Sequence, residues 1–209
     1  MPTTTELTEG YISEHRSIKD CLQKGIINYS ALSRLIGKEL NIERKTSREA
    51  ILVAALRFKE KIKGTALKDE IIKLFKNSDI EIKNNIVIYT LEKHIYPGAL
   101  IDIEITIKKD KDLFFSIEGT KTITLVIQEK NTKVIEQKFK NNIIKKREKL
   151  SLITISSPGI ENIPGAVYHI SGLFFESDIN IEEFMSCHHD TLIVIESKNI
   201  NKAINFLKL

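Results

Sequence analysis

The tripeptide Pro-Gly-Ala occurs twice in the 209-residue chain, at Pro97–Ala99 and at Pro164–Ala166. Proline is favoured at the first position of a helix, and glycine lets the backbone approach a ligand closely. The free N–H groups of a first helical turn, together with the helix dipole, can hold a carboxylate. Each loop is therefore a candidate anion-binding loop, and the alternative is that Pro-Gly only starts a helix.

The distance between the two tripeptides indicates an internal repeat. They lie 67 positions apart, and other residues recur at the same spacing. A repeat of one supersecondary unit determines the architecture, so the sequence predicts two similar units that carry the same loop. The recurring pairs are Ile86 with Ile153, Ile88 with Ile155, Thr124 with Thr191, Leu125 with Leu192, and Glu129 with Glu196.

The first 79 residues have apolar side chains at helical spacing. A first helix is expected to end at Gly25, and Asn28 can cap a second. Thr46 or Ser47 can cap a third helix, which has a basic C-terminal end. A fourth is expected over Ala66–Lys76. These residues form a predicted helical domain, 1–79.

From Ile80 the apolar period changes to two, and Asn84–Asn85 could form a tight turn between two short strands. The rest predicts an α+β fold with two βαββα units, 80–148 (the first repeat) and 149–209 (the second repeat), each a split βαβ, ferredoxin-like pattern. The first repeat is expected to contain strand Asn85–Leu91, helix Pro97–Lys108, strands Asp112–Ile117 and Thr122–Gln128, and helix Thr132–Asn141. The second is expected to contain strand Leu150–Ser156, helix Pro164–Ser177, strands Ile179–Ser186 and Thr191–Ile195, and helix Ile200–Leu207.

The second repeat lacks a fourth strand, because only two residues follow its last helix. An open sheet edge would present unpaired backbone groups. We expect Ile80–Lys83, Ile143–Glu148 or a second subunit to fill the gap.

Three segments of the second repeat together resemble an ACT domain: Pro164–Ala166, Ile179-Asn180-Ile181-Glu182, and Thr191–Ile195 before a closing helix. The tandem arrangement is most similar to the paired regulatory ACT domains of aspartate kinases. The resemblance covers about 125 of the 209 residues. It is weaker in the first repeat, which has Leu113-Phe114-Phe115-Ser116 in place of the Ile-Asn-Ile-Glu segment.

The resemblance implies two βαββαβ ACT-type units packed side by side, a homodimer, and an amino-acid ligand bound against the loop before the first helix. Asn180 could accept a hydrogen bond from the ligand's ammonium group. The second loop is the better candidate, since only it is followed by Ile-Asn-Ile-Glu. The candidate ligand-binding residues are Ser157, Ile163, Pro164, Gly165, Ala166, Asn180 and Ile181 in the second repeat, and Tyr96, Pro97, Gly98 and Ala99 in the first.

The net charge of +4 resides entirely in residues 1–83, which hold 16 Lys/Arg and 12 Asp/Glu, whereas the remainder holds 16 of each. The predicted helices, followed by a hairpin, resemble a helix-turn-helix or winged-helix arrangement. The segment Asp20–Leu35 resembles the region that precedes ACT domains in a group of uncharacterised archaeal proteins. In a DNA-binding interpretation the helix from Ser47 enters the major groove and basic residues meet phosphates. These residues are Arg44, Lys45, Arg48, Arg57 and Lys61.

That helix is also unusually apolar, which favours a structural or dimerising helical domain instead. Two function hypotheses therefore stay open. One is a transcription regulator that senses a small molecule. The other is a regulatory subunit that controls a partner enzyme of amino-acid metabolism and does not bind DNA.

Other chemistry is weakly supported. Cys187-His188-His189-Asp190 contains metal-ligating side chains, but alternation along strands would separate them, so no metal site is expected. No catalytic motif or cofactor loop is recognisable, and we expect a regulatory protein and not an enzyme. Cys21 and Cys187 are expected to be reduced thiols. No apolar run reaches the ~20 residues of a membrane span, and the start is polar, so a cytoplasmic location without membrane contact is expected.

Overall fold

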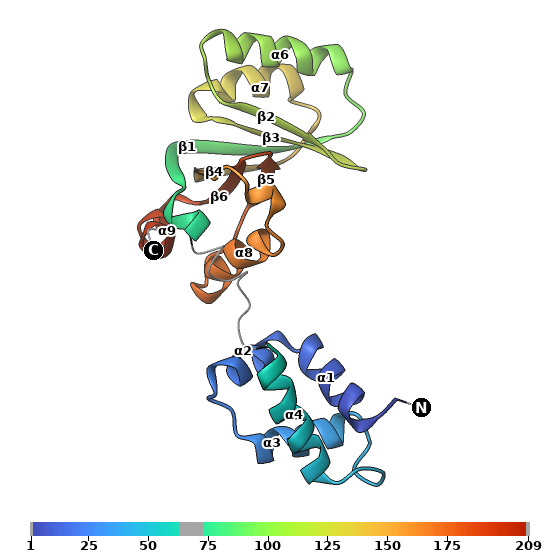
Figure 1. Cartoon of the computed structure of the whole chain (residues 1–209). Coiled ribbons are helices and arrows are strands. Elements are labelled where there is room, and N and C mark those ends of the chain that lie inside the picture. The colour runs from blue at the N-terminus through green and yellow to red at the C-terminus, as the bar shows by residue number, and fades with distance from the viewer. Residues whose placement is uncertain (1, 63–72, 208–209) are drawn as a thin grey trace. The chain divides into compact units, whose positions relative to one another are not determined.

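The computed structural model of the protein describes residues 2–62 and 73–207. The chain separates into two compact units, Met1–Ala66 (the helical unit) and Leu67–Leu209 (the sheet unit); Figure 1 shows their elements. The expected helix Ala66–Lys76 lies mostly outside the described residues, of which 73–76 are helical. Within the described ranges no helix is both long and apolar enough to cross a membrane.

Four helices form the described part of the helical unit: α1 (Thr4–Glu14), α2 (Arg16–Lys24), α3 (Tyr29–Glu39) and α4 (Arg48–Ile62). The predicted end signals are confirmed. Gly25 ends α2 with a left-handed φ of 72°, and Asn28 Oδ1 accepts a 3.0 Å hydrogen bond from the Ala31 amide. Ser47 Oγ accepts a 3.2 Å bond from the Ala50 amide at the start of α4. Local capping therefore determines where these helices begin and end.

Helix α4 supplies much of the core of this unit. One face of α4 is buried through Ile51, Ala55 and Phe58, which pack against apolar residues of the other three helices. The opposite face is open, because Val53 and Leu56 are each 41% exposed. The expectation of an apolar core helix thus holds for one face only. The buried partners are Tyr11, Ile12, Leu22, Leu32, Ile36 and Ile42.

The sheet unit is α+β, with a six-stranded antiparallel sheet of order β2-β3-β1-β4-β6-β5, as the predicted fold class requires. Along the chain its helices alternate with strands, and the last helix follows the last strand. The elements are β1 (Asp79–Glu92), α6 (Pro97–Lys109), β2 (Phe114–Glu118), β3 (Thr122–Gln128), α7 (Thr132–Phe139), β4 (Ile143–Ser156), α8 (Ala166–Glu176), β5 (Glu183–Cys187), β6 (Asp190–Glu196) and α9 (Ile200–Leu207). Short 3₁₀ turns precede α7, α8 and α9 at Glu129–Asn131, Ile160–Asn162 and Ser197–Asn199.

Strands β1 and β4 are 14 residues long, and each serves both repeats. The first half of β1 pairs with the second half of β4, with Ile80 opposite Ile155. The second half of β1 pairs with β3 and with the first half of β4, with Tyr89 opposite Lys146. Ile143–Glu148 therefore pairs within the first repeat, whereas the second repeat takes a strand from the first. Of the three alternatives expected to complete the second repeat, Ile80–Lys83 is the one that does so.

The tight turn expected at Asn84–Asn85 is wrong, because β1 continues through both residues. The register against β4 shifts between Lys83 and Ile86, and Asn85 takes a left-handed φ of 57°, so the two asparagines form a bulge. Hydrogen bonds hold the bulge: buried Ser151 donates to Asn84 Oδ1 at 2.8 Å and lies 2.8 Å from the Ser197 hydroxyl. A winged hairpin at this position is therefore excluded.

Apolar residues of the sheet unit form three buried clusters. One lies between β1, β2, β3 and helices α6 and α7, and another lies between β4, β6 and helices α8 and α9. Figure 1 shows the strands between these two helix pairs. The third cluster consists almost wholly of strand residues, among them Ile88, Val126, Leu152 and Val194. Strand alternation thus gives both faces of the central strands a buried partner.

A polar network joins three elements of the first repeat. The hydroxyl of fully buried Tyr89 donates to Glu136 Oε1 of α7 at 2.8 Å, and Lys146 Nζ of β4 lies 2.8 Å from the same oxygen. Burial and the contact with Glu136 raise the pKa of Tyr89 well above its ordinary range. Hydrogen bonds from Lys146 and Tyr89 lower the pKa of Glu136 below its ordinary 4.5.

We expect Tyr89→Phe to lower the free energy of opening of the β1 amides by about 1–2 kcal/mol, because the buried tyrosine loses its hydrogen bond to a partly exposed carboxylate. Native-state hydrogen exchange measures this quantity for the sheet unit separately from the helical unit. Tyr96→Phe, at a solvent-exposed tyrosine, is the matched control and should change nothing. Equal protection in wild type and Tyr89→Phe would contradict the role of the network.

The lowered pKa of Glu136 also predicts a pH dependence. A depressed carboxyl pKa stabilises the folded state fully above the ordinary value of 4.5, and this stabilisation is lost as the pH falls through the lower folded value. Between about pH 5 and about pH 3 the opening free energy of β1 should fall less in Glu136→Gln than in wild type. Parallel pH profiles of the two proteins, measured by hydrogen exchange, would exclude this contribution.

Candidate functional site

The two Pro-Gly-Ala loops start their helices differently. Pro97 is the first residue of α6, as predicted. Helix α8 begins only at Ala166, so Pro164 lies outside it and Gly165 is its N-cap, with a left-handed φ of 86°. The prediction that Pro164 opens the helix is wrong by two residues. A glycine is needed at the second loop for its conformation, because left-handed backbone is costly for other residues.

The space in front of the two glycines also differs. A Cβ atom on Gly98 would lie 2.5 Å from Cε1 of the Tyr96 ring, so this ring covers the first turn of α6. A Cβ atom on Gly165 would meet nothing within 4 Å. Tyr96 itself is 80% exposed. The start of α8 is therefore open to a small molecule, whereas the start of α6 is screened by a tyrosine.

A pocket with a volume of about 420 Å³ lies beside the second loop. Three of its lining residues follow β4, namely Ser157, Pro158 and Ile163, and the other three precede β1, namely Lys73, Leu74 and Asn77. Sequence reasoning identified Ser157 and Ile163. It missed the three residues before β1, which are more than 80 positions away from the loop.

Strand pairing brings these two segments together. Asp79 pairs with Ser156, so the residues before β1 lie next to the residues after β4. Ser157 is only 1% exposed; its amide donates to the His189 carbonyl at 2.8 Å, and its hydroxyl is hydrogen-bonded to that of Ser78. The pocket is thus bordered by residues whose backbone is held by the sheet.

The remaining candidates of the second repeat are not among the lining residues of the pocket. Pro164, Gly165 and Ala166 follow Ile163 directly, and Ala166 is buried. Asn180 is exposed, and its side-chain amide donates to Glu182 Oε1 at 3.1 Å. Ile181 packs against the apolar cluster beneath α8 and α9.

The Ile-Asn-Ile-Glu segment is a loop and not the predicted strand, because β5 begins at Glu183. Only the amide of Glu182 extends the pairing, by donating to the Val194 carbonyl at 2.8 Å. The Glu182 carboxylate forms an ion pair with Arg147 of β4. Part of this segment therefore holds the middle of β4 in place.

In the first repeat a pocket of about 290 Å³ lies elsewhere, between α6 and α7. Tyr96, Pro97, Gly98 and Ala99 are not among its lining residues. Ala99 instead packs against the cluster under α6 and α7. The lining residues are Asp102, Ile103, Thr106, Val134, Gln137 and Lys138.

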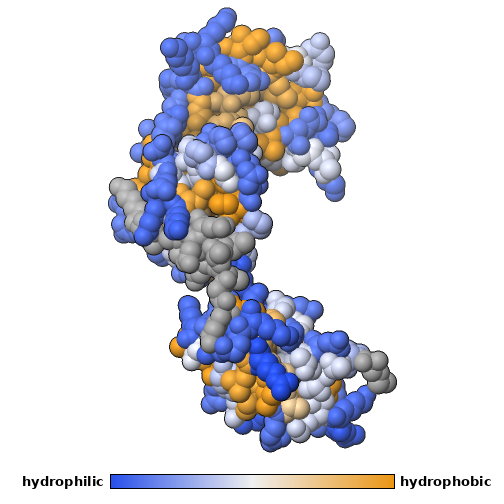
Figure 2. Space-filling view, in the orientation of Figure 1, coloured by the Kyte–Doolittle hydropathy of each residue, from blue (hydrophilic) through white to orange (hydrophobic). Residues whose placement is uncertain are grey.

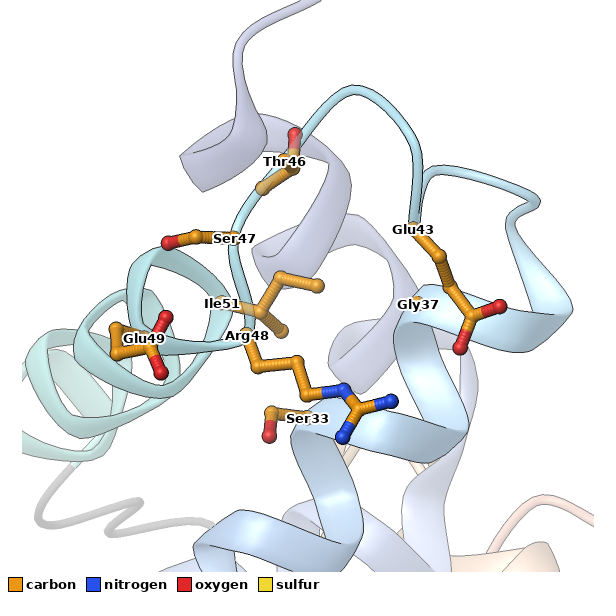
Figure 3. Close-up of a pocket in the computed structure, with 8 residues that line it drawn as sticks. All are labelled: Ser33, Gly37, Glu43, Thr46, Ser47, Arg48, Glu49 and Ile51. Carbon is orange, nitrogen blue, oxygen red and sulfur yellow. The ribbon is translucent and has the colours of Figure 1, made fainter.

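The helical unit has a pocket of about 320 Å³ at the start of α4, shown in Figure 3. The Arg48 side chain extends over α3 toward Ser33, and Glu43 comes from the loop on the other side. Arg48, one of the candidate phosphate contacts, is thus directed across the neighbouring helix. The lining residues are Ser33, Gly37, Glu43, Thr46, Ser47, Arg48, Glu49 and Ile51.

The five candidate nucleic-acid residues are all exposed, but they do not share one face. Arg48 and Arg57 are nine residues apart on α4, which places them on opposite sides of a helix with 3.6 residues per turn. Lys61 is ion-paired with Glu9 of α1. Arg44 and Lys45 lie in the loop between α3 and α4.

A scan against protein-family models and a comparison with curated proteins found no match. Solved structures do match. The chain is similar to aspartate kinase of Clostridium acetobutylicum, described as an allosteric enzyme, with 19% identity, a TM-score of 0.52, and coverage of 62% of this chain and 33% of that one. It is also similar to the regulatory subunit of aspartate kinase from Thermus flavus (9% identity, TM-score 0.51, 61% of this chain and 94% of that one). Aspartate kinase from Synechocystis matches at 17% identity and TM-score 0.51, over 61% of this chain and 26% of that one.

These identities are low, so the likeness is one of fold. The predicted similarity to aspartate kinase regulatory domains is confirmed at that level. The chain spans about a third of the length of the Clostridium enzyme.

The two glycines give a matched pair of substitutions. Gly165→Ala should destabilise the sheet unit by about 1–2 kcal/mol, because alanine must adopt a left-handed φ. Gly98→Ala should change stability by less than roughly 0.5 kcal/mol, since the exposed Tyr96 ring can turn away and alanine favours the helix. Hydrogen exchange of the β1 amides measures both. A larger loss in Gly98→Ala than in Gly165→Ala would contradict the difference between the loops.

Proposed function

We propose that this chain is a regulatory protein that binds a small molecule, an amino acid, beside the second Pro-Gly-Ala loop. The pocket between the residues before β1 and those after β4 carries the proposal. Its volume of about 420 Å³ lies within the range of small-molecule sites. Among the residues that the structure describes, its lining combines one cation, two neutral polar side chains and three apolar ones, namely Lys73, Asn77, Ser157, Leu74, Pro158 and Ile163.

This set of side chains suits an amino acid. The Lys73 ammonium can bind the α-carboxylate through a charge-assisted hydrogen bond. The side-chain carbonyl of Asn77 can accept a hydrogen bond from the ligand's ammonium group. Leu74 and Ile163 offer apolar contact to the ligand side chain. Asn77 takes the role that the sequence suggested for Asn180, because Asn77 lines the pocket and Asn180 is not among its lining residues.

The fold comparison supports a regulatory role over a catalytic one. The Thermus flavus protein is a regulatory subunit, and this chain covers 94% of it. A fold alone does not determine a function, so the support from the pocket residues is the stronger. Paired ACT-type units in a homodimer remain part of the proposal.

We further propose that the helical unit transmits the signal by contacting a partner protein. Four of its apolar side chains, Ile26, Leu35, Val53 and Leu56, are exposed, and Figure 2 shows apolar surface among its hydrophilic residues. The five candidate phosphate contacts are divided between different sides of α4 and a loop, and Lys61 is paired with Glu9. This arrangement suits protein contact better than a row of phosphates.

Ligand binding can be tested by thermal unfolding of the full chain with each of the twenty amino acids at millimolar concentration. A ligand that binds only the folded state raises the midpoint temperature. Lys73→Gln should lower the affinity for the amino acid that responds by about tenfold or more, because a charge-assisted hydrogen bond is lost. Lys138→Gln, in the pocket of the first repeat, is the control and should leave the affinity unchanged. No response to any amino acid, or equal losses in both variants, would refute the site.

Fluorescence anisotropy with duplex DNA at about 50 mM and about 200 mM salt can test whether the helical unit binds DNA or contacts a partner protein. If the helical unit contacts a partner protein, we expect no saturable DNA binding at the higher salt concentration. The DNA-binding alternative predicts binding that weakens steeply with salt. Loss of this DNA binding in each of the variants Arg44→Ala, Arg48→Ala and Arg57→Ala would then establish a regulator that binds DNA.

A further inference from the structure

Three metal-ligating side chains meet at the turn between β5 and β6. Glu161 lies in the 3₁₀ turn Ile160–Asn162, and His188 and His189 lie between Cys187 and Asp190. One ligand atom from each lies within 4.8 Å of the other two. His189 Nδ1 is 3.3 Å from Glu161 Oε2, and His188 Nδ1 is 4.0 Å from Glu161 Oε1.

The turn brings the two histidines to the same side. The expectation that they would point apart rests on strand alternation, which does not apply to a two-residue turn. His188 has a left-handed φ of 51°, and the two imidazole rings stack with centroids 3.8 Å apart and planes 26° apart. The Ser157 amide donates to the His189 carbonyl at 2.8 Å, which ties the turn to the loop that carries Glu161.

Neighbouring groups define the donor set as two nitrogens and one carboxylate. The Asp190 carboxylate accepts a 2.6 Å hydrogen bond from Ser156 Oγ. Cys187 is exposed but does not belong to the group of converging ligand atoms. Imidazole nitrogens with a carboxylate are the ligands of zinc and of similar divalent transition metals, whereas Mg²⁺ and Ca²⁺ prefer oxygen.

We propose that Glu161, His188 and His189 bind one divalent transition metal ion of the zinc type. In a tetrahedral site with bonds of about 2.0–2.1 Å, ligand atoms lie about 3.4 Å apart. The separations of 3.3 and 4.0 Å, which run to the two different oxygens of Glu161, are close to this value. The stacked imidazole rings must rotate for their lone pairs to converge on one ion, and Glu161 and His188 are exposed and can move. Three protein ligands leave a fourth position for water.

The site has a consequence for the neighbouring loop. Glu161 lies between Pro158 and Ile163, which both line the pocket of the second repeat. A metal ion bound there would fix this loop to the β5–β6 turn. The metal site stands on its own geometry and does not require that an amino acid binds in the pocket.

The test is isothermal titration of the full chain with ZnCl₂ and absorption titration with Co²⁺, after the protein has been freed of metal with a chelator. The expected result is saturable binding of one ion per chain. Glu161→Gln and His189→Gln should each weaken the affinity at least tenfold, because each removes a ligand. His94→Gln, an exposed histidine in the loop before α6, and Cys187→Ser should bind as wild type does.

The metal-free variants are compared with wild type by circular dichroism and thermal unfolding, which separates loss of a ligand from loss of the fold. A variant that melts as wild type does but binds metal weakly supports the site. Absence of saturable binding up to about 1 mM Zn²⁺ would overturn the proposal, and so would undiminished binding in Glu161→Gln and His189→Gln. Loss of binding in Cys187→Ser would overturn the donor set.

Discussion

The pairing of β1 with β4 is the interaction on which the rest of the sheet unit depends. Both strands are long enough to serve both repeats, and they pair with each other in both halves. The second repeat has no fourth strand of its own, so its sheet is completed only when Ile80–Lys83 of the first repeat pairs with it. The bulge at Asn84–Asn85, held by Ser151, lets one strand change register midway and serve both partners.

The same pairing explains how residues far apart in the chain form one pocket. Asp79 opposite Ser156 places the residues before β1 beside those after β4. The pocket therefore exists only in the paired state, whereas the first loop, at the far end of β1, is covered by Tyr96. Two copies of one tripeptide thus have different surroundings.

Local signals in the sequence predicted most elements of the fold, because caps and apolar periods act over a few residues. Gly25, Asn28 and Ser47 mark helix ends as expected, and the bounds of β3 and α9 agree with those predicted. The predictions that failed concern features that depend on contacts between distant segments. The continuation of β1 through Asn84 depends on hydrogen bonds from Ser151 and pairing with β4, and the contribution of Lys73 to the pocket depends on strand register. The convergence of His188 with Glu161 likewise depends on a turn conformation and a remote loop.

Strand β1 also connects the pocket with the first loop along the chain. Its fourteen residues span roughly 45 Å. Ile86–Glu92 pairs with a strand on each side, whereas Asp79–Lys83 pairs with β4. One end begins two residues after Asn77, at the pocket, and the other end leads within four residues to Tyr96. The bulge at Asn84–Asn85 lies between these two ends, so one strand leads from the pocket to the first loop and bends on the way.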